Sequence, residues 1–396
     1  MIHIGFHMGD ALFWRGPGQR LYRGTLEDWP DWLRFVLDSE DVSDILYYAD
    51  RLPYHVKALT VARGMAVRCW AIENGYLRPD WITMEPEGMG AHSRFTRSPQ
   101  QIEELSANAD VPDLAPLYHH SFTREAFSEV TYHLAMALGA PIFSKYNNDK
   151  YYPPLLDYLC WLKRWSCGGA ARRRAKTTAK QIGKGGPATF LLALQLQSDY
   201  QIRASSPYSC LSEMLEEVIA SFATEAPQDT RLVVKLHPMD NGWENWPEFT
   251  TDLAERYGVA ERVVAIDGGE LKDLLLCAEG VVTVNSTVGL HALRLGCPVI
   301  VLGDAIYDVE GLTHQSGLMT FWRSPTKPDP ELFACYAGAL ASEIQVRGSF
   351  YDPAGRATAI KEIAQRLTVA ERYWRLYRGP EEVGCTPYQL PAVAAE

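Results

Sequence analysis

The sequence has 396 residues, of which 47% are hydrophobic and 22% are charged, proportions that are ordinary for a packed globular protein and exclude disorder and collagen. The formal net charge of -11 gives the chain as a whole no attraction for phosphate backbones, so nucleic-acid binding is disfavoured as its main role. At ~150 residues per domain, the length predicts two domains.

No apolar stretch approaches the ~20 residues that span a bilayer, and the amino terminus lacks a basic region followed by a long apolar core. We therefore expect a cytoplasmic protein. The 8 cysteines are scattered without a Cys-x-x-Cys pair, so free thiols are expected and a zinc site is not.

The first half of the chain predicts one βαβ unit. Short apolar runs at 45–48 and 67–72 are typical of strands, and residues 54–63 between them are typical of a helix. Residues 2–6 predict a further strand. Residues 107–145 contain helical stretches with many aromatic side chains and no clear period. This half is therefore predicted to be an α/β domain with insertions.

Residues 163–186 concentrate positive charge in an otherwise acidic chain. This basic segment contains Lys163, Arg164, Arg172, Arg173, Arg174, Lys176, Lys180 and Lys184. One interpretation is a solvated linker between two domains. The other is a segment attracted to anionic lipid, where each Lys or Arg contributes ~1 kcal/mol near the surface.

The second half of the chain predicts a doubly wound α/β domain. Short β-branched runs occur at 190–196, 232–236, 263–266, 281–284 and 299–302. Apolar residues recur at three- and four-residue steps between 211 and 222, as in an amphipathic helix. Strands that alternate with helices indicate a parallel sheet covered on both faces. The last stretch, 351–377, has a helical pattern and is expected to cross back over the first domain.

Polar residues follow the predicted strands, where ligands bind in open α/β sheets. Asn285, Ser286 and Thr287 stand between the strand 281–284 and a helical segment. Free backbone N–H groups and two hydroxyls at such a turn favour an anion. The alternative is an ordinary helix N-cap, for which Ser and Thr are also preferred.

His237 follows a strand and precedes Pro238, and Lys235 lies two residues earlier on the same side of the strand. The imidazole could donate a hydrogen bond to a phosphate oxygen or a leaving group, or it could be a structural histidine at the sheet edge. Because this turn and the Ser286 turn end two strands of one sheet, the two turns could hold a single phosphate.

Two acidic residues are candidates for chemistry. Asp199 follows the strand 190–196 and could be a nucleophile or an acid–base group, or it could cap a helix. Glu73 follows the strand 67–72, with Gly75 permitting a tight turn, and would suit acid–base work unless it lies in a surface turn. His314 and Gln315 come just after the last predicted strand.

Five segments resemble a known family: 73–83, 195–203, 235–240, 284–289 and 306–315. In this order, across roughly residues 40–350, they are similar to the bacterial capsule polysaccharide proteins of the KpsS/LipB type. The resemblance implies a GT-B-like α/β fold with two Rossmann-like, doubly wound domains facing across a cleft. It also implies a retaining β-Kdo glycosyltransferase that transfers Kdo from CMP-Kdo to a phosphatidylglycerol-type lipid, which starts the capsule polysaccharide linker.

The same resemblance suggests three domain ranges and a location. Residues 1–187 would form an acceptor-side domain, 188–345 the CMP-sugar-binding domain, and 346–396 helices that pack back on the first domain. The protein would act at the inner face of the inner membrane as a peripheral protein, with the basic segment on anionic lipid and possible contacts to other capsule assembly proteins. No metal or other cofactor is implied.

A wider similarity to CMP-sugar transferases, including bacterial sialyltransferases, implies residue roles. Asp199 would be the nucleophile and Glu73 the acid–base group, although which of the two attacks stays open. Asn74 stands where many relatives have a second acid. Arg78 and Arg203 are candidates for holding the acidic sugar. The implied substrate-binding residues are Gln195, Lys235, His237, Pro238, Asn285, Ser286, Thr287, His314 and Gln315.

Two alternatives remain open. An inverting, sialyltransferase-like CMP-sugar transferase would keep His237 and Ser286 but would not need Asp199 for chemistry. A non-catalytic capsule export or binding protein would need neither Asp199 nor His237 for function.

Overall fold

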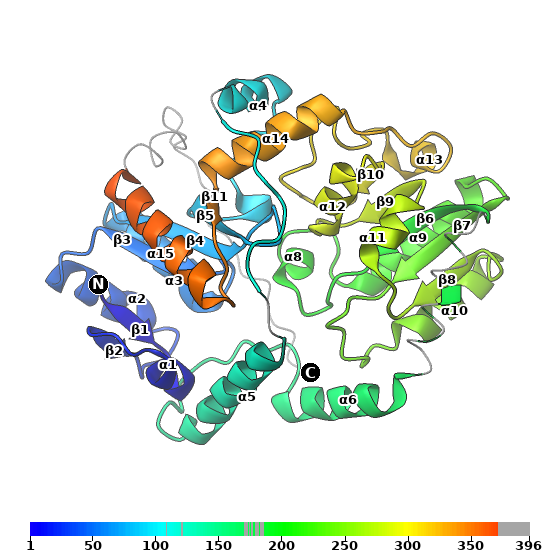
Figure 1. Cartoon of the computed structure of the whole chain (residues 1–396). Coiled ribbons are helices and arrows are strands. Elements are labelled where there is room, and N and C mark those ends of the chain that lie inside the picture. The colour runs from blue at the N-terminus through cyan, green and yellow to red at the C-terminus, as the bar shows by residue number, and fades with distance from the viewer. Residues whose placement is uncertain are drawn as a thin grey trace.

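The computed structural model describes residues 1–107, 109–119, 122–169, 173, 175, 177–178, 182 and 186–370. The chain forms two lobes that lie side by side, each built around its own β-sheet (Figure 1). The α/β fold class expected from the sequence is confirmed. Within the described ranges, no helix combines the length and the apolar character that a membrane crossing requires.

The second lobe contains a five-stranded parallel sheet in the order β10-β9-β6-β7-β8. Its strands are β6 (Ala188–Ala193), β7 (Thr230–Lys235), β8 (Val263–Ile266), β9 (Gly280–Thr283) and β10 (Val299–Val301). Its helices are α8 (Tyr200–Arg203), α9 (Leu211–Glu225), α10 (Trp246–Arg256), α11 (Leu271–Leu276), α12 (Val288–Arg294) and α13 (Gly317–Phe321). The predicted doubly wound domain is confirmed, and the apolar stripe of α9 is fully buried against the sheet.

The side of the sheet on which successive strands are added changes between β6 and β9. From β6 the chain adds β7 and β8 on one side, and it then returns to add β9 and β10 on the other. The loops after β6 and β9 therefore diverge at the carboxyl edge of the sheet, which is where open α/β sheets bind ligands.

The first lobe has a four-stranded mixed sheet in the order β11-β5-β4-β3. Its strands are β3 (Asp44–Tyr48), β4 (Arg68–Asn74), β5 (Trp81–Pro86) and β11 (Gln345–Arg347). β3, α3 (Pro53–Gly64) and β4 form the predicted βαβ unit, and β3 and β4 pair in parallel. However, β4 and β5 pair antiparallel, so this sheet is mixed rather than doubly wound. The connection over residues 75–80 is too short for a parallel crossover, which needs a dozen or more residues.

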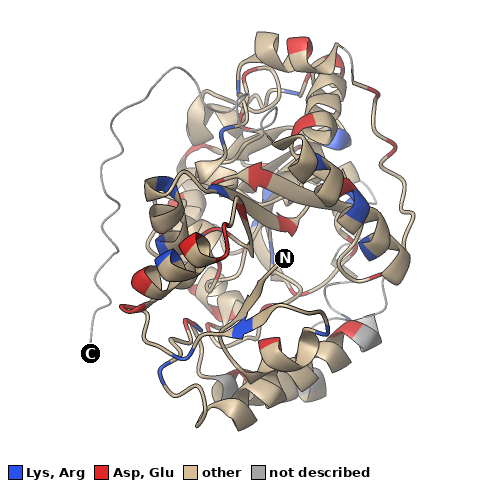
Figure 2. Ribbon diagram, turned by 90° about the vertical axis from the view of Figure 1, so that its left-hand side faces the viewer, with Lys and Arg blue, Asp and Glu red and all other residues tan. Residues whose placement is uncertain are grey.

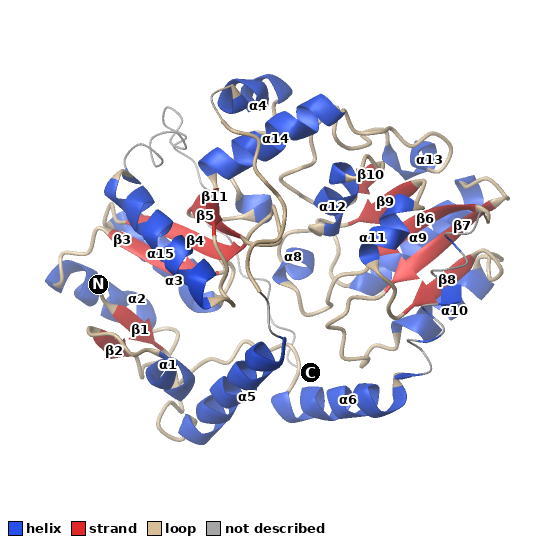
Figure 3. Cartoon of the chain, in the orientation of Figure 1, coloured by secondary structure: helices blue, strands red, loops and turns tan. Residues whose placement is uncertain are grey.

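The remaining elements of the first half of the chain lie outside this sheet. They are β1 (His3–Gly5), α1 (Met8–Phe13), β2 (Gln19–Leu21), α2 (Trp29–Ser39), the 3-10 turn η1 (Gly90–His92), α4 (Pro99–Ser106), α5 (Phe122–Gly139) and α6 (Pro154–Cys167). β1 and β2 make a small separate sheet. α5 and α6 lie along the lower edge of the molecule in Figure 3.

The carboxyl-terminal part of the described chain returns to the first lobe. α14 (Pro330–Glu343) contacts α4, and β11 then joins the sheet beside β5. α15 (Pro353–Thr368) packs its residue Ala359 near Trp70 and Met84, within one buried apolar cluster. The domain boundaries proposed from the sequence stay predictions.

Candidate active site

Two amide side chains join the loops that diverge at the carboxyl edge of the second sheet. Gln195, after β6, donates from Nε2 to Asn285 Oδ1 at 2.9 Å, and the Asn285 backbone N–H donates back to Gln195 Oε1 at 3.3 Å. Asn285 Nδ2 also donates to the carbonyl oxygen of Gln201 at 2.8 Å. These residues were expected to contact substrate. In the structure their hydrogen bonds hold the two loops together.

Asp199 lies in the loop after β6 and is the N-cap of α8, where its Oδ1 accepts from the backbone N–H of Gln201 at 2.9 Å. The helix-cap interpretation is therefore confirmed. Burial raises the pKa of this carboxyl group, and hydrogen bonds from Gln201 and Gln195 and the charge of Arg78 oppose the increase. A carboxylate has about four lone-pair sites, so capping leaves Asp199 able to act on a ligand as well.

Glu73 is the penultimate residue of β4, in the first lobe, and its side chain is half-buried. Burial raises its pKa from 4.5 to about 7; the charge of Arg78 opposes this, and the negative charges of Asp199 and Asp50 add to it. Asp199 from the second lobe and Glu73 from the first therefore lie within electrostatic reach of each other. A carboxyl group that titrates near neutral pH suits proton transfer.

Arg78 lies in the hairpin between β4 and β5, where its Nε donates to the carbonyl oxygen of Gly75 at 3.1 Å. Its charge acts on the pKa of Glu73, of Asp199 and of His237. Burial lowers the pKa of His291 on α12, and the charge of Arg78 lowers it further. One exposed guanidinium group from the first lobe is thus within electrostatic reach of residues of both lobes.

His291 did not stand out in the sequence. It lies five residues after Ser286 within an apolar helical segment, where the pattern gave it no special position. The signal that could have identified it is its place on the helix that follows the Ser286 turn.

His237 follows β7, and its Nδ1 accepts from the backbone N–H of Met239 at 3.1 Å. Burial lowers its pKa to about 4, and the positive charges of Lys235, Arg78 and Arg164 lower it further. The imidazole is therefore neutral at pH 7. Because Nδ1 is an acceptor, the ring proton is on Nε2, which can donate to an anionic oxygen. Pro238, the next residue, is exposed.

Lys235 is the last residue of β7 and is 7% exposed. Burial lowers its pKa, and the negative charges of Asp267 and Glu270 oppose this decrease. Arg164, at the end of α6, donates to Asp267 Oδ1 at 2.6 Å. Lys235 and Arg164 therefore supply positive charge beside His237 while acidic neighbours compensate part of it.

The turn after β9 keeps its two hydroxyls close to the helix start. Ser286 Oγ accepts from the backbone N–H of Val288 at 3.2 Å, as an N-cap does. Thr287, the formal N-cap residue of α12, makes no capping hydrogen bond with its side chain. Tyr307 stabilises this turn. Its hydroxyl donates to the carbonyl oxygen of Ser286, and its ring packs on Gly289.

A loop of the first lobe contacts the helix that Asp199 caps. At Gly90, which has a φ of +58°, an added Cβ would lie 2.8 Å from Oε1 of Gln201. The Gly90 N–H donates to the Tyr76 hydroxyl at 2.8 Å, and that hydroxyl donates to Oε1 of Glu85 at 3.0 Å. Glu85 is 1% exposed. This buried network fixes the loop at Gly90, which lies next to Gln201 of α8.

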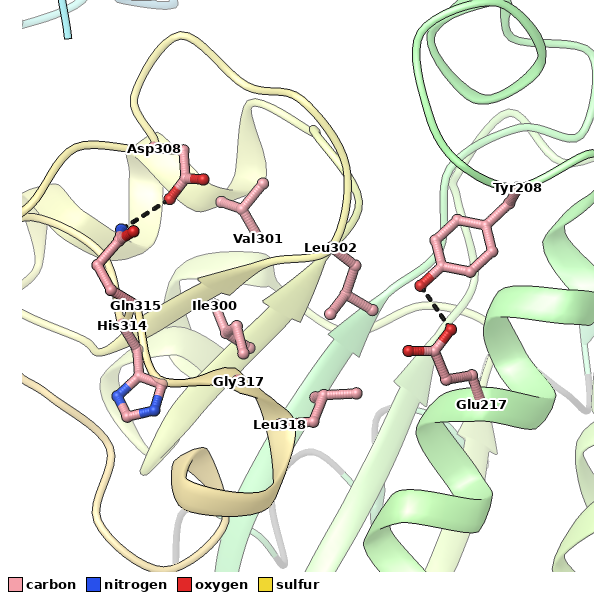
Figure 4. A pocket seen from close by; sticks show the side chains of 10 residues that line it. All are labelled: Tyr208, Glu217, Ile300, Val301, Leu302, Asp308, His314, Gln315, Gly317 and Leu318. Atoms are coloured by element: carbon pink, nitrogen blue, oxygen red, sulfur yellow. Dashed lines mark hydrogen bonds between the residues drawn. The ribbon is translucent and has the colours of Figure 1, made fainter.

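His314 and Gln315 lie elsewhere, in a cavity of about 330 Å³ beside the edge strand β10 (Figure 4). Both ring nitrogens of His314 are hydrogen-bonded, to the hydroxyls of Thr326 and Thr320. Gln315 donates to Asp308 Oδ1 at 3.0 Å. None of the other predicted site residues lines this cavity, so the structure does not bring these two together with Asp199. Their binding role stays a prediction.

The three cations Lys163, Arg164 and Arg173 of the basic segment are described. The other five, Arg172, Arg174, Lys176, Lys180 and Lys184, lie outside the residues whose side chains the structure describes. Arg164 pairs with Asp267 and Asp240 of the second lobe. It therefore contributes to the site rather than to a solvated linker.

A family model and two relatives indicate one family. The family model described as capsule polysaccharide biosynthesis protein matches residues 43–351. The capsule polysaccharide export protein KpsS of Escherichia coli is 32% identical over 351 residues, which are 88% of this chain and 90% of that protein. The capsule polysaccharide modification protein LipB of Neisseria meningitidis serogroup B is 31% identical over 364 residues, which are 88% of this chain and 84% of LipB.

Among solved structures, the beta Kdo 2,7 transferase KpsC of Thermosulfurimonas dismutans matches with a TM-score of 0.44 and 16% sequence identity. The match covers 89% of this chain and 93% of that structure. The matched family region, 43–351, includes Glu73, Asp199, His237 and the turn at Ser286.

Proposed function

Because the chain belongs to the capsule polysaccharide biosynthesis protein family, we propose that it is a retaining glycosyltransferase that moves Kdo from CMP-Kdo to a phosphatidylglycerol-type lipid. This reaction would start the linker of the capsule polysaccharide. One observation carries the proposal: Glu73 and Asp199, from opposite lobes, interact electrostatically with each other and with Arg78. The two carboxyl groups would serve as nucleophile and base, and the arginine near both would bind the carboxylate of an acidic sugar.

In the first step Asp199 attacks the anomeric carbon, the bond from that carbon to the phosphate oxygen breaks, and CMP leaves with the electron pair. The Nε2–H of His237 and the hydroxyls of Ser286 and Thr287 would donate to the departing phosphate. Fixed donors stabilise developing charge because they need little reorganisation as the bond breaks. The proposed step uses no metal ion.

In the second step a hydroxyl of the acceptor attacks the glycosyl ester, Asp199 leaves as a carboxylate, and Glu73 takes the hydroxyl proton. A group with a pKa of about 7 is substantially ionised at neutral pH and can accept that proton. Arg78 would hold the carboxylate of the sugar in both steps. Two displacements at one carbon restore the original configuration.

The acceptor also sets the proposed location. A phosphatidylglycerol-type acceptor lies in a bilayer, so we propose that the protein works as a peripheral protein at the inner face of the inner membrane. The cations of the basic segment would contribute attraction to anionic headgroups.

The test uses the pure full-length chain with CMP-Kdo and a phosphatidylglycerol acceptor, followed by mass spectrometry. The native protein is expected to add Kdo to the lipid, and Asp199→Ala to lose turnover. Glu73→Gln is expected to accumulate a Kdo adduct on Asp199, because the second step lacks its base. Asp38→Asn, an exposed carboxylate on α2, is the matched control and should behave as the native chain.

Full turnover by Asp199→Ala would contradict the nucleophile assignment. Inversion of the anomeric configuration, read by NMR of the product, would point to a sialyltransferase-like enzyme. The name of the Escherichia coli relative favours a second candidate, a non-catalytic capsule export or binding protein. That candidate requires that the native chain shows no turnover and that Asp199→Ala still restores capsule in cells.

A further inference from the structure

Helix α5 is apolar on the side that faces away from the protein. Phe127, Val130, Leu134 and Leu138 recur at three- and four-residue steps, and between 54% and 74% of each side chain is exposed. The opposite side of α5 packs on α1 through Tyr132, whose ring lies 5.4 Å from that of Phe13. A helix that is apolar on two sides normally buries both, but the outer side of α5 has no apolar partner among the residues that the structure describes.

The neighbouring helices α1 and α6 also expose apolar side chains. Tyr158, Leu159 and Leu162 of α6 are 46% to 60% exposed, and Leu12 and Phe13 of α1 are 57% and 47% exposed. His133 of α5 connects the two long helices, because its Nδ1 lies 3.4 Å from the Tyr158 hydroxyl. Large exposed apolar side chains gathered on adjoining helices are typical of an interaction site.

Positive charges border this surface. Arg15 follows α1, Lys145 follows α5 and Lys163 lies next to Leu162 on α6, and all three are exposed. In Figure 2 the ribbons at the lower edge of the molecule carry few coloured residues. Acidic side chains lie nearby as well: Asp157 is held by Asn241 at 2.8 Å on the side of the second lobe, and Glu129 of α5 is exposed. Apolar stripes bordered by Lys and Arg are typical of helices that lie in a membrane interface.

This surface adjoins the candidate active site. Tyr151, in the connection between α5 and α6, is 44% exposed, and its ring centroid lies 5.1 Å from Cζ of Arg203. Arg203 belongs to α8, the helix that Asp199 caps. At the other end of α6, the charge of Arg164 acts on His237.

We propose that the outer sides of α1, α5 and α6 form a docking surface for an anionic lipid bilayer. Docked there, the protein would place Arg203 and Asp199 next to the headgroup layer, so a lipid acceptor need not leave the membrane. The choice of lipid as the occupant rests on the proposed function. A second copy of the chain could cover the apolar side chains, but it would give no role to Arg15, Lys145 and Lys163.

The test measures flotation of the full-length chain, without sugar donor, on vesicles of phosphatidylcholine alone and of phosphatidylcholine with phosphatidylglycerol. The native chain should bind the anionic vesicles more strongly and less so at high salt. The double variant Phe127→Ser with Leu134→Ser should lose binding by at least about tenfold. Phe35→Ser is the control, because Phe35 is 69% exposed on α2, which is not part of the proposed surface. Circular dichroism verifies that each variant is folded.

Two results would overturn the docking surface: equal flotation of the double variant and the native chain, or a native dimer in light scattering that the double variant dissociates. Transfer to a short-chain, water-soluble acceptor separates this proposal from the proposed function. A native chain that transfers Kdo to that acceptor but does not bind vesicles contradicts the docking surface alone. A native chain that binds vesicles but transfers nothing contradicts the proposed function alone.

Discussion

At the site, burial moves the pKa of an acid and of a base in opposite directions. It raises that of Glu73 to about 7 and lowers that of His237 to about 4. Of these two groups, only Glu73 changes its charge between about pH 5.5 and 8.5, while His237 stays neutral. A change in activity centred near pH 7 should therefore report Glu73, whereas the buried Glu85 titrates higher, near 8.

We expect kcat to rise as the pH increases through about 7, since the proposed base of the second step must be ionised. Glu73→Gln should lose roughly 10²- to 10⁴-fold in kcat and should no longer show this rise. Steady-state kinetics across the pH range measures both. An unchanged pH profile in Glu73→Gln would assign the titration to another group.

Glu85 is a second buried acid, in the network with Tyr76 and the loop to Gly90. Burial raises its pKa to about 8, against the hydrogen bonds from Ser93 and Tyr76. The folded state therefore binds its proton more tightly than the unfolded state does, where the pKa is near 4.5. Its contribution to stability is complete below about pH 4.5 and is lost as the pH rises to 8.

The native free energy of unfolding should accordingly fall by roughly 2 to 4 kcal/mol between pH 5 and 8 from this group. Glu85→Gln, which cannot ionise, should show a flatter profile and should gain on the native chain at pH 8. Urea unfolding at several pH values gives the comparison. Parallel profiles of the two proteins would show that Glu85 does not titrate in this range.

At the level of elements, the sequence predicted the second lobe better than the first. Strands buried on both faces appear as continuous β-branched runs, so all five were found, and the strand 263–266 was found with its bounds. β5 was not predicted, for two reasons. Glu85 and Pro86 at its end resemble a turn, and its antiparallel pairing with β4 depends on the short hairpin between the two strands. β11 has three residues and pairs with a strand far away in the sequence, a pairing that no local pattern reveals.

The candidate site was predicted in the same uneven way. The positions at strand ends follow from the alternation of strands and helices, so Asp199, His237 and Ser286 were identified. The mutual hydrogen bonds of Gln195 and Asn285, and the enclosure of His314 by Thr320 and Thr326, depend on which side chains meet in space. Sequence patterns alone do not contain that information.

The turn after β9 offers a prediction at this scale. A Cβ on Gly289 would lie 2.3 Å from the Tyr307 hydroxyl, so Gly289→Ala must displace the tyrosine or the turn. We expect a loss of roughly 1 to 3 kcal/mol in stability and weaker binding of CMP. Gly64→Ala is the control, because a Cβ there meets nothing within 4 Å. Calorimetry of CMP binding and thermal unfolding measure the two effects, and an unaffected affinity would separate the turn from the nucleotide site.

Across the whole molecule, two arginines join distant parts with different expected strengths. Arg97 of the first lobe pairs with Asp304 after β10, and both side chains are more than one third exposed. Arg366 of α15 is 7% exposed and donates to the carbonyl oxygens of Glu343 and Gln345. We expect Arg97→Ala to change the free energy of unfolding by less than ~1 kcal/mol.

Arg366→Met should cost more, roughly 2 to 4 kcal/mol, because it leaves buried carbonyl groups without donors. Chemical denaturation of both variants provides the measurement. If Arg366→Met also lowers the free energy of unfolding by less than ~1 kcal/mol, α15 contributes little to the stability of the first lobe.

The pairing of β5 with β11 has a consequence for the order in which the protein is made. Gln345 Nε2 donates to Thr83 Oγ1 across a separation of 262 residues. During synthesis, the five strands of the second sheet leave the ribosome within one stretch, residues 188–301. The sheet of the first lobe keeps an open edge at β5 until β11 has been synthesised. The lobe that is translated first is therefore the one completed last, and a nonsense mutation anywhere before β11 would leave that edge unprotected against aggregation.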